Sequence, residues 1–224
     1  MRACVLSFLF CLLASLPAAA DRAKEVERIK NATEVFSEVM GIPEKSIPHQ
    51  LLAGAECIAI VPSMKKGGFI VGGHFGRGIV SCRHGAGRQF GPPSMLTVGG
   101  GSFGLQIGGQ AVDVIMLIMN KKGVNFLMKD KFTLGADASV AAGPVGRATS
   151  AETNAAMRAE ILTYSRARGL FAGVVLKGAV VKPDEGGNRD LYGRELPARA
   201  ILVEGRAPTP PEARPLLGAI SKYR

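Results

Sequence analysis

Two overlapping glycine-rich motifs around Ser102 are the first places where this sequence suggests chemistry. Residues 99–104, Gly-Gly-Gly-Ser-Phe-Gly, fit the GxGxxG pattern of a dinucleotide-binding loop, whose glycines let the backbone approach a pyrophosphate. Residues 100–104 also fit GxSxG, the nucleophile elbow of an α/β-hydrolase, in which the central serine attacks an acyl group. Both sites require a helix directly after the motif.

The sequence that follows argues against both chemistries. Residues 105–109, Leu-Gln-Ile-Gly-Gly, continue the alternation of a strand, with apolar side chains on one face. A hydrolase triad of that fold runs serine, acid, histidine along the chain. His49, His74 and His84 all precede Ser102. We therefore predict that the protein is not an enzyme, and a small hydrolase with another triad order is the least favoured alternative.

The cysteines and histidines do not form a metal-binding pattern. His74, Cys82 and His84 lie close together, but they lack the CxxC or HxxxH spacing typical of zinc sites. We expect no metal and no cofactor. Once residues 1–20 are removed, Cys57 and Cys82 remain, and they form either one disulfide or two buried thiols.

Paired basic residues are the remaining functional signal in a chain whose formal net charge is +10. Lys65 and Lys66 fall in an expected turn, and Lys121, Lys122, Lys129 and Lys131 flank an expected short helix. Cations of this kind are attracted to anionic membrane surfaces. Single-stranded nucleic acid is disfavoured because its binders usually add stacking aromatics, which make up only 6% of this chain. The simpler interpretation is that these are solvated loop charges.

Residues 1–20 have the layout of a secretory signal peptide. Arg2 precedes an apolar stretch over residues 3–16, and Pro17-Ala18-Ala19-Ala20 supplies small residues before Asp21. The alternative is a membrane anchor, but the apolar stretch is shorter than the about 20 residues that a spanning helix needs. We expect cleavage near Ala20 and a secreted or periplasmic protein.

A helix is predicted over residues 21–40, because Val26, Ile29, Phe36 and Met40 share one stripe and Gly41-Ile42-Pro43 ends the pattern. Its polar side balances acidic and basic residues, whereas a helix that lies in a lipid surface is usually distinctly basic. Docking of this helix on its own domain is therefore favoured over lipid contact.

Glycine-rich strands are predicted for most of the remaining chain, in which glycine accounts for 29 of 224 residues. Apolar residues alternate over 102–108 and 133–142, residues 114–119 fit a strand covered on both faces, and a last strand spans 170–181. A short helix over 124–128 and a terminal helix over 211–223 complete the pattern.

The expected fold is α+β: a curved, mostly antiparallel, glycine-rich sheet or barrel-like core with an N-terminal amphipathic helix and a few short helices. We divide it into the signal peptide (1–20) and one domain (21–224), with a helical segment (21–55), a β-rich core (56–182) and a C-terminal segment (183–224).

The order of short motifs along the whole mature chain resembles the SYLF domain family. The segments that carry this resemblance are 54–62 (GAECIAIVP), 66–69 (KGGF), 75–80 (FGRGIV), 92–95 (PPSM), 101–108 (GSFGLQIG), 134–137 (LGAD), 142–147 (AGPVGR), 164–165 (YS), 169–173 (GLFAG), 191–193 (LYG) and 201–205 (ILVEG). The resemblance implies a non-enzymatic module that binds phosphoinositides and other anionic phospholipids. In eukaryotic members it also implies actin binding, and in some members an N-terminal amphipathic helix contributes to the lipid contact.

Taken together, the residues and the resemblance predict an exported module that binds anionic, phosphoinositide-like membrane surfaces. The lipid-binding candidates are Lys65, Lys66, Lys121, Lys122, Lys129, Lys131 and Arg147, with Val26, Ile29 and Phe36 on the first helix. The alternative is a protein-interaction module whose partner is actin-like or an envelope protein.

Overall fold

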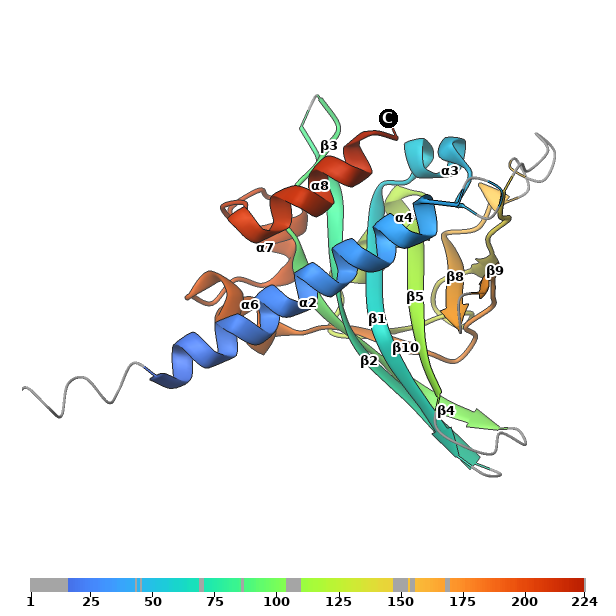
Figure 1. Ribbon diagram of the computed structural model, residues 1–224, viewed down its shortest axis with the longest axis horizontal. Coiled ribbons are helices and arrows are strands. Elements are labelled where there is room, and N and C mark those ends of the chain that lie inside the picture. Colours follow the sequence, from blue (N-terminus) through green and yellow to red (C-terminus); the bar gives the residue numbers. More distant parts are fainter. Residues whose placement is uncertain are drawn as a thin grey trace, which may run out of the picture.

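A single curled sheet organises the protein in the computed structural model (Figure 1). The structure describes residues 16–42, 44, 46–68, 71–85, 87–103, 110–146, 153, 156–167 and 170–223. Ten strands form a half-barrel in the order β6-β10-β4-β2-β1-β5-β8-β7, with β3 paired to β2 and β9 paired to β8. All pairs are antiparallel except β7–β8. The expected α+β class, with a curved and mostly antiparallel sheet, is confirmed.

The strands and helices have the following bounds. The strands are β1 (Cys57–Gly68), β2 (Val71–His84), β3 (Gln89–Phe90), β4 (Ser94–Phe103), β5 (Gln110–Ile118), β6 (Phe132–Thr133), β7 (Val140–Ala142), β8 (Ile161–Ala167), β9 (Leu170–Gly173) and β10 (Val180–Pro183). The helices are α2 (Leu16–Met40), α3 (His49–Gly54), α4 (Lys121–Leu127), α6 (Glu185–Tyr192), α7 (Ala198–Leu202), η2 (Pro211–Ala213) and α8 (Arg214–Ser221).

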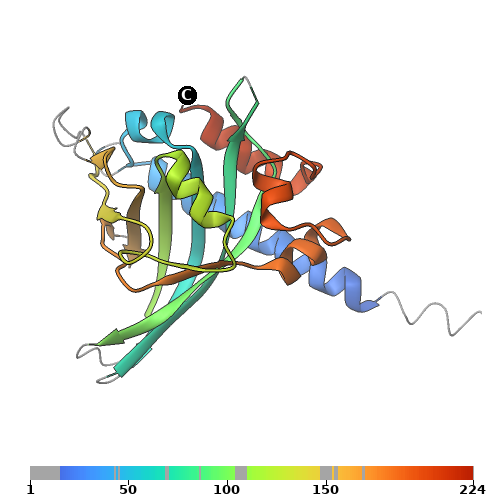
Figure 2. The ribbon, with the colours of Figure 1, turned by 180° about the vertical axis from the view of Figure 1, so that it is seen from behind.

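The sheet has an apolar core on each face, because successive strand residues point to opposite sides. In β5, Val114 and Met116 join one core, and Ile115 and Leu117 join the other. Residues of α4 and α7 pack into the first core, and residues of α2, α3, α6 and α8 pack into the second. Figures 1 and 2 show these two helical layers from opposite sides. The prediction of a strand covered on both faces at residues 114–119 is therefore confirmed.

The far ends of β1, β2 and β4 project beyond the helical layers (Figures 1 and 2). Glycine is required where the strands bend and approach each other. A Cβ at Gly78 of β2 would lie 2.3 Å from the carbonyl oxygen of Ile60 in β1. The register shifts between Ile60 and Lys65, where Ser63 adopts a φ of 48°. The bulge that results re-aims the last residues of β1.

Two predicted strands are interrupted by turns. Residues 133–142 split into β6 and β7, because Gly135 (φ 82°) begins a turn in which the Asp137 carboxylate accepts a hydrogen bond from the Thr133 backbone N–H at 2.7 Å. Residues 170–181 split into β9 and β10 around Gly178, whose φ is also 82°. Positive φ is the conformation that favours glycine, so these glycines mark turns rather than strand interiors.

The N-terminal helix is longer than predicted. Residues 1–15 lie outside the described residues, and α2 extends from Leu16 across the expected cleavage position at Ala20. No helix within the described ranges is both long enough and apolar enough to cross a membrane.

Candidate functional site

The glycine-rich motif around Ser102 is part of the sheet. Gly99, Gly101 and Ser102 belong to β4 and pair with Phe75, Gly73 and Gly72 of β2. The backbone is thus an extended strand as far as Phe103, and residues 104–109 lie outside the described part of the chain. Among the described residues, no group of three or more His, Cys, Asp or Glu side chains is arranged to hold a metal ion.

Cys57 and Cys82 form a disulfide between β1 and β2. They are register partners whose Cα atoms lie 4.0 Å apart, and both are buried. Of the two alternatives that the sequence left open, the structure therefore shows the disulfide. It fixes one end of the β1–β2 pair, beside the N-terminus of α4.

The structure does not bring the predicted lysines to one surface. Lys65 and Lys66 lie at the projecting end of β1. Lys121 and Lys122 follow β5, whose Ile118 pairs with Cys57 at the other end of β1. Eight residues of strand separate Cys57 from Lys65, which corresponds to about 26 Å. The lysines therefore form two groups at opposite ends of the sheet.

The projecting end places an aromatic side chain beside a cation, and we call this cluster the Lys65–Phe75 end (Lys65, Lys66, His74, Phe75). Lys65 pairs in register with Phe75, and Lys66 pairs with His74. Phe75 is 52% exposed, although most large apolar side chains of the sheet are buried. Neither lysine has an ion-pair partner within the described ranges. Burial, followed by the charge of Lys66, lowers the pKa of His74.

The lysines around α4 have mixed surroundings. The Lys122 ammonium lies 2.5 Å from the Glu160 carboxylate, and the Lys129 ammonium lies 4.7 Å from the centre of the Phe126 ring. Burial would raise the pKa of Glu160, but hydrogen bonds from Lys122 and Ser139 outweigh it and leave that pKa below its ordinary value. Lys121 and Lys131 are exposed. Arg147, also a predicted lipid-binding residue, lies outside the described residues.

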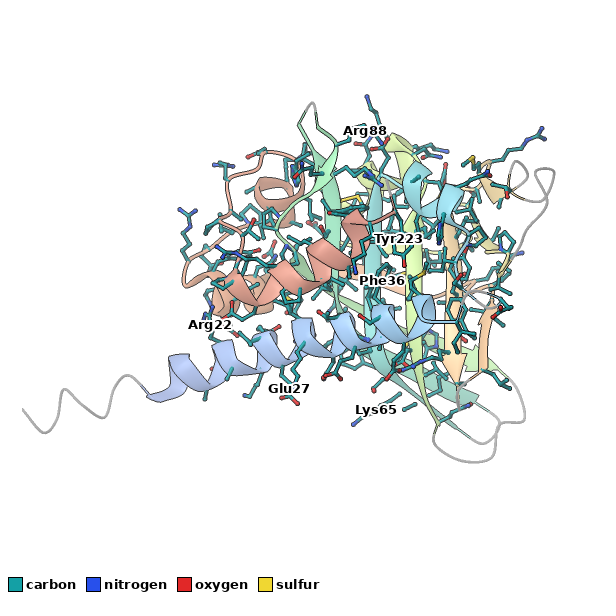
Figure 3. All side chains as sticks on the ribbon, turned by 45° about the horizontal axis from the view of Figure 1, so that its top comes forward. Arg22, Glu27, Phe36, Lys65, Arg88 and Tyr223 are labelled. Atoms are coloured by element: carbon teal, nitrogen blue, oxygen red, sulfur yellow. A yellow bond between two sulfur atoms is a disulfide. The ribbon has the colours of Figure 1, made fainter. Side chains whose placement is uncertain are left out.

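The apolar stripe of α2 docks on the sheet and on α8. Ile29 is 0% exposed and Phe36 is 1% exposed, and Val26 is half-buried against the same core. The Phe36 ring meets the Tyr223 ring edge-on at 6.1 Å (Figure 3). In this conformation Ile29 and Phe36 are therefore core residues, and lipid contact through them would require α2 to swing away from the sheet.

Ion pairs also hold α2 in place. The buried Arg28 guanidinium lies 2.9 Å from the Glu25 carboxylate and 3.1 Å from the Asp184 carboxylate, which caps α6. Arg22 pairs with Glu212 at 3.0 Å, and Glu38 pairs with Arg166, which also binds Asp113 at 2.8 Å. The favoured prediction, that the helix docks on its own domain, is confirmed.

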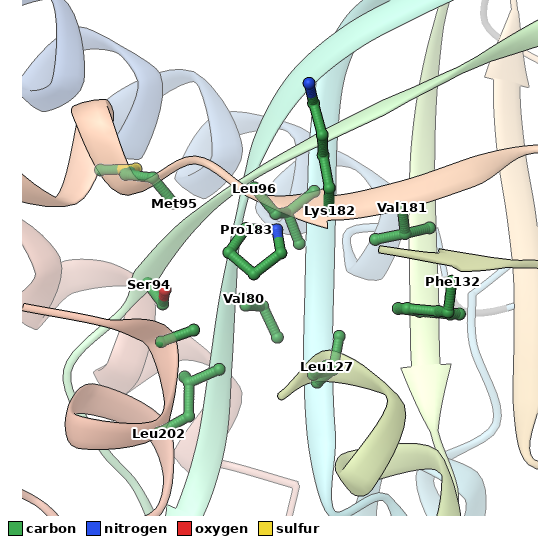
Figure 4. Close-up of a pocket in the computed structure, with 11 residues that line it drawn as sticks. Val80, Ser94, Met95, Leu96, Leu127, Phe132, Val181, Lys182, Pro183 and Leu202 are labelled. Atoms are coloured by element: carbon green, nitrogen blue, oxygen red, sulfur yellow. The ribbon is translucent and has the colours of Figure 1, made fainter. Parts of the chain in front are cut away.

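Two cavities differ in what they are able to hold. The first, between β2, β4, β10, α4 and α7, has a volume of about 10 Å³ and a mostly apolar lining that includes Val80 and Leu127 (Figure 4). It accommodates at most about one water molecule, so it is a small packing gap within the core. The second has a volume of about 340 Å³ and lies between the end of β2, α4 and α7, where Lys121 and Arg199 line it.

Sequence reasoning missed Phe75, His84 and Arg199 as site residues. Phe75 was detectable in principle, because Lys65 and Phe75 are placed symmetrically about position 70 of the sequence and so face each other in a hairpin. Arg199 and His84 come from distant segments, and only the tertiary fold brings them to the same cavity as Lys121.

Comparison with known proteins places these features in a family. The family model described as "Ysc84: Las17-binding protein actin regulator" matches residues 99–223. The human SH3 domain-containing YSC84-like protein 1 is 33% identical over 207 residues, which cover 91% of this chain and 58% of that protein. Protein YSC84 of Saccharomyces cerevisiae is 32% identical over 88% of this chain and 42% of its own length. An SH3 domain-containing protein of Schizosaccharomyces pombe is 34% identical over 77% of this chain and 40% of its own. The chain thus spans about 40–60% of the length of these relatives.

Proposed function

Because the chain belongs to the Ysc84 family of actin regulators, also called SYLF, we propose that it is a non-enzymatic module that binds anionic phospholipid surfaces through the Lys65–Phe75 end. Membrane surfaces that carry phosphoinositide-like headgroups belong to this class. The observation that supports the proposal is an exposed aromatic ring directly opposite a lysine that has no ion-pair partner among the described residues, on a projecting part of the sheet.

The physical argument combines charge and burial. Each lysine close to an anionic surface contributes about 1 kcal/mol, and this contribution falls off within a Debye length. Two lysines alone therefore give weak, salt-sensitive binding. Phe75 adds apolar area that gains by leaving water when the strand end enters the headgroup region. Lys65 and Phe75 share one face of the sheet and Lys66 lies on the other, so the strand end presents a cation on both sides.

The other predicted lipid contacts support this surface less well. Lys122 is paired with Glu160, and Ile29 and Phe36 are buried under α2. Lys121 and Lys122 lie at the opposite end of β1 and β5. A flat membrane that touches the Lys65–Phe75 end therefore cannot also touch Lys121 and Lys122 without bending around the domain.

Vesicle co-sedimentation tests the proposal. We expect the protein to bind vesicles that contain phosphatidylserine or a phosphatidylinositol phosphate, to bind phosphatidylcholine alone weakly, and to lose binding as salt rises. The K65E/K66E variant should bind weakly at any salt concentration. The K30E/K222E variant makes the same change of charge at two exposed positions elsewhere and should bind like the native protein. Equal binding by both variants would contradict the proposal.

A protein partner is the second candidate function, favoured by the family description as a Las17-binding actin regulator. Actin-filament co-sedimentation without vesicles separates the candidates, because an actin-binding module should pellet with filaments in the absence of lipid.

Export of the protein is also a proposal. It predicts that the protein purified from its native host begins at Asp21, which intact-mass measurement would detect.

A further inference from the structure

A cavity of about 340 Å³ lies at the end of the sheet opposite the Lys65–Phe75 end. We call it the α4–α7 cavity. The end of β2, α4 and α7 form its walls, and the Cys57–Cys82 disulfide joins β1 and β2 beside it. Its size falls within the range of about 300–1,000 Å³ that is usual for small-molecule sites.

The cavity carries uncompensated positive charge. Lys121 of α4 and Arg199 of α7 are exposed, and neither has an ion-pair partner in the described part of the chain. The Glu56 carboxylate, which also lines the cavity, pairs with Arg88 at 3.1 Å. Arg83, which also lines the cavity, has a structural role, because its Nε donates a hydrogen bond to the Ala55 carbonyl oxygen at 2.8 Å. Lys121 and Arg199 therefore remain available to an incoming anion.

The rest of the lining is suited to a ligand with an apolar part. Val124, Met128 and Leu202 supply apolar side chains to the lining that also contains the two cations. His84 also lines the cavity, and its buried Nε2 has no hydrogen-bond partner among the described residues. A third cavity, of about 310 Å³, contrasts with this one, because the acids Asp130 and Glu185 line it and would repel an anion.

We propose that the α4–α7 cavity binds a small phosphate monoester, with the phosphate at Lys121 and Arg199 and the organic part against Val124 and Leu202. A phosphate monoester is close to a dianion at neutral pH. It therefore matches two cations supplied by separate helices, and the planar guanidinium of Arg199 is suited to bidentate phosphate contact. The monoester is either a free solute or the headgroup of phosphatidic acid. This site lies far from the Lys65–Phe75 end, and it does not depend on the membrane contact proposed there.

Phenyl phosphate is a suitable probe, because it joins a phosphate monoester to a small apolar ring. The chain contains three histidines, and their ring resonances in ¹H NMR report on separate places. His84 lines the cavity, His74 lies at the Lys65–Phe75 end, and His49 contacts Tyr223. We expect saturable shifts of the His84 ring during titration, with His74 and His49 unchanged. Benzyl alcohol, which lacks the phosphate, should leave His84 unchanged.

Variants at the two exposed cations test the assignment. K121A/R199A should weaken phenyl phosphate binding about tenfold or more, because each residue provides a charge-assisted hydrogen bond. K30A/K222A removes the same charge elsewhere and should retain native affinity, as should K65E/K66E. The single variants K121A and R199A should each give an intermediate loss. The proposal is overturned if His84 does not shift, if benzyl alcohol shifts it equally, or if K121A/R199A retains native affinity.

Vesicles of phosphatidylcholine with and without phosphatidic acid identify the source of the phosphate. The comparison is made in the K65E/K66E background, because the Lys65–Phe75 end is itself expected to bind anionic vesicles. Loss of phosphatidic acid binding when K121A/R199A is added to that background assigns the cavity to a lipid headgroup. Unchanged vesicle binding, together with loss of phenyl phosphate binding, assigns it to a soluble ligand. Failure of the membrane proposal would appear instead as equal vesicle binding by K65E/K66E and K30E/K222E, and it would leave the phenyl phosphate titration unaffected.

Discussion

Arg28 is the residue on which the docking of α2 depends most directly. Its guanidinium is 8% exposed and balances two carboxylates, Glu25 at 3% exposure and Asp184 at 13%. Burial is the main reason that the pKa of Glu25 lies above its ordinary value, and the charge of Arg28 opposes this rise. Removal of Arg28 would leave the buried Glu25 carboxylate without its partner.

R28A should lower the free energy of unfolding by about 3–5 kcal/mol, the usual cost of removing one partner of a buried ion pair. Urea denaturation measures this cost. K24A is the control, because Lys24 forms an exposed pair with Asp21 on the same helix and should leave stability unchanged within error. Equal stability of R28A and K24A would show that the buried network does not anchor α2.

His74 and His84 should make the protein less stable in mild acid. Burial lowers the pKa of both residues from the ordinary value of 6.5. Below pH 6.5 the unfolded chain therefore binds more protons than the folded one, and the free energy of unfolding falls as pH drops toward the lowered values. Stability from these groups is fully present above pH 6.5.

Urea denaturation at pH values from about 7 to 5 tests this dependence. The H74Q/H84Q variant should lose less stability than the native protein over that range. The single variants H74Q and H84Q should each show part of that reduction. The difference between variants is the informative quantity, because Glu25, with its raised pKa, contributes the opposite slope at lower pH. An unchanged slope in H74Q/H84Q would contradict the prediction.

Glycines differ in whether their surroundings leave room for a larger side chain, as Gly78 of β2 and Gly218 of α8 show. A Cβ at Gly78 would lie 2.3 Å from the Ile60 carbonyl oxygen, whereas a Cβ at Gly218 of α8 would meet nothing within 4 Å. G78A should therefore destabilise the protein by about 1–3 kcal/mol through overpacking. G218A should stabilise it by roughly 0.5–1 kcal/mol, because glycine is unfavourable inside a helix. Thermal unfolding of the two variants measures both effects, and shifts of the same sign would contradict the account.

Elements with strong periodicity were predictable from the sequence. The stripe of Ile29 and Phe36 on α2 and the apolar run of β5 both keep their predicted type. The predicted strands over residues 133–142 and 170–181 were too long, because alternation alone does not distinguish a strand from a turn built on Gly135 or Gly178. Positive φ at these glycines is not visible in a pattern of apolar residues.

For the molecule as a whole, the positions of the cations could not be predicted from the sequence. Lys65 and Lys121 look equivalent along the chain, but β1 and β5 carry them to opposite ends of the sheet. Which lysines are already paired, such as Lys122 with Glu160, depends on contacts between distant segments. The fold therefore separates the predicted cations into the Lys65–Phe75 end, for which we propose membrane contact, and the α4–α7 cavity, for which we propose binding of a small anion.

Tryptophan fluorescence of a single-site variant tests the membrane contact most directly. The native chain has no tryptophan, so F75W places a unique fluorophore at the Lys65–Phe75 end. L170W is the matched control, because Leu170 of β9 is 69% exposed and lies on a different strand pair. We predict that vesicles rich in phosphatidylserine shift the emission of F75W to shorter wavelength and leave that of L170W unchanged. Emission from F75W that stays at its aqueous wavelength while the protein sediments with the vesicles would contradict the account.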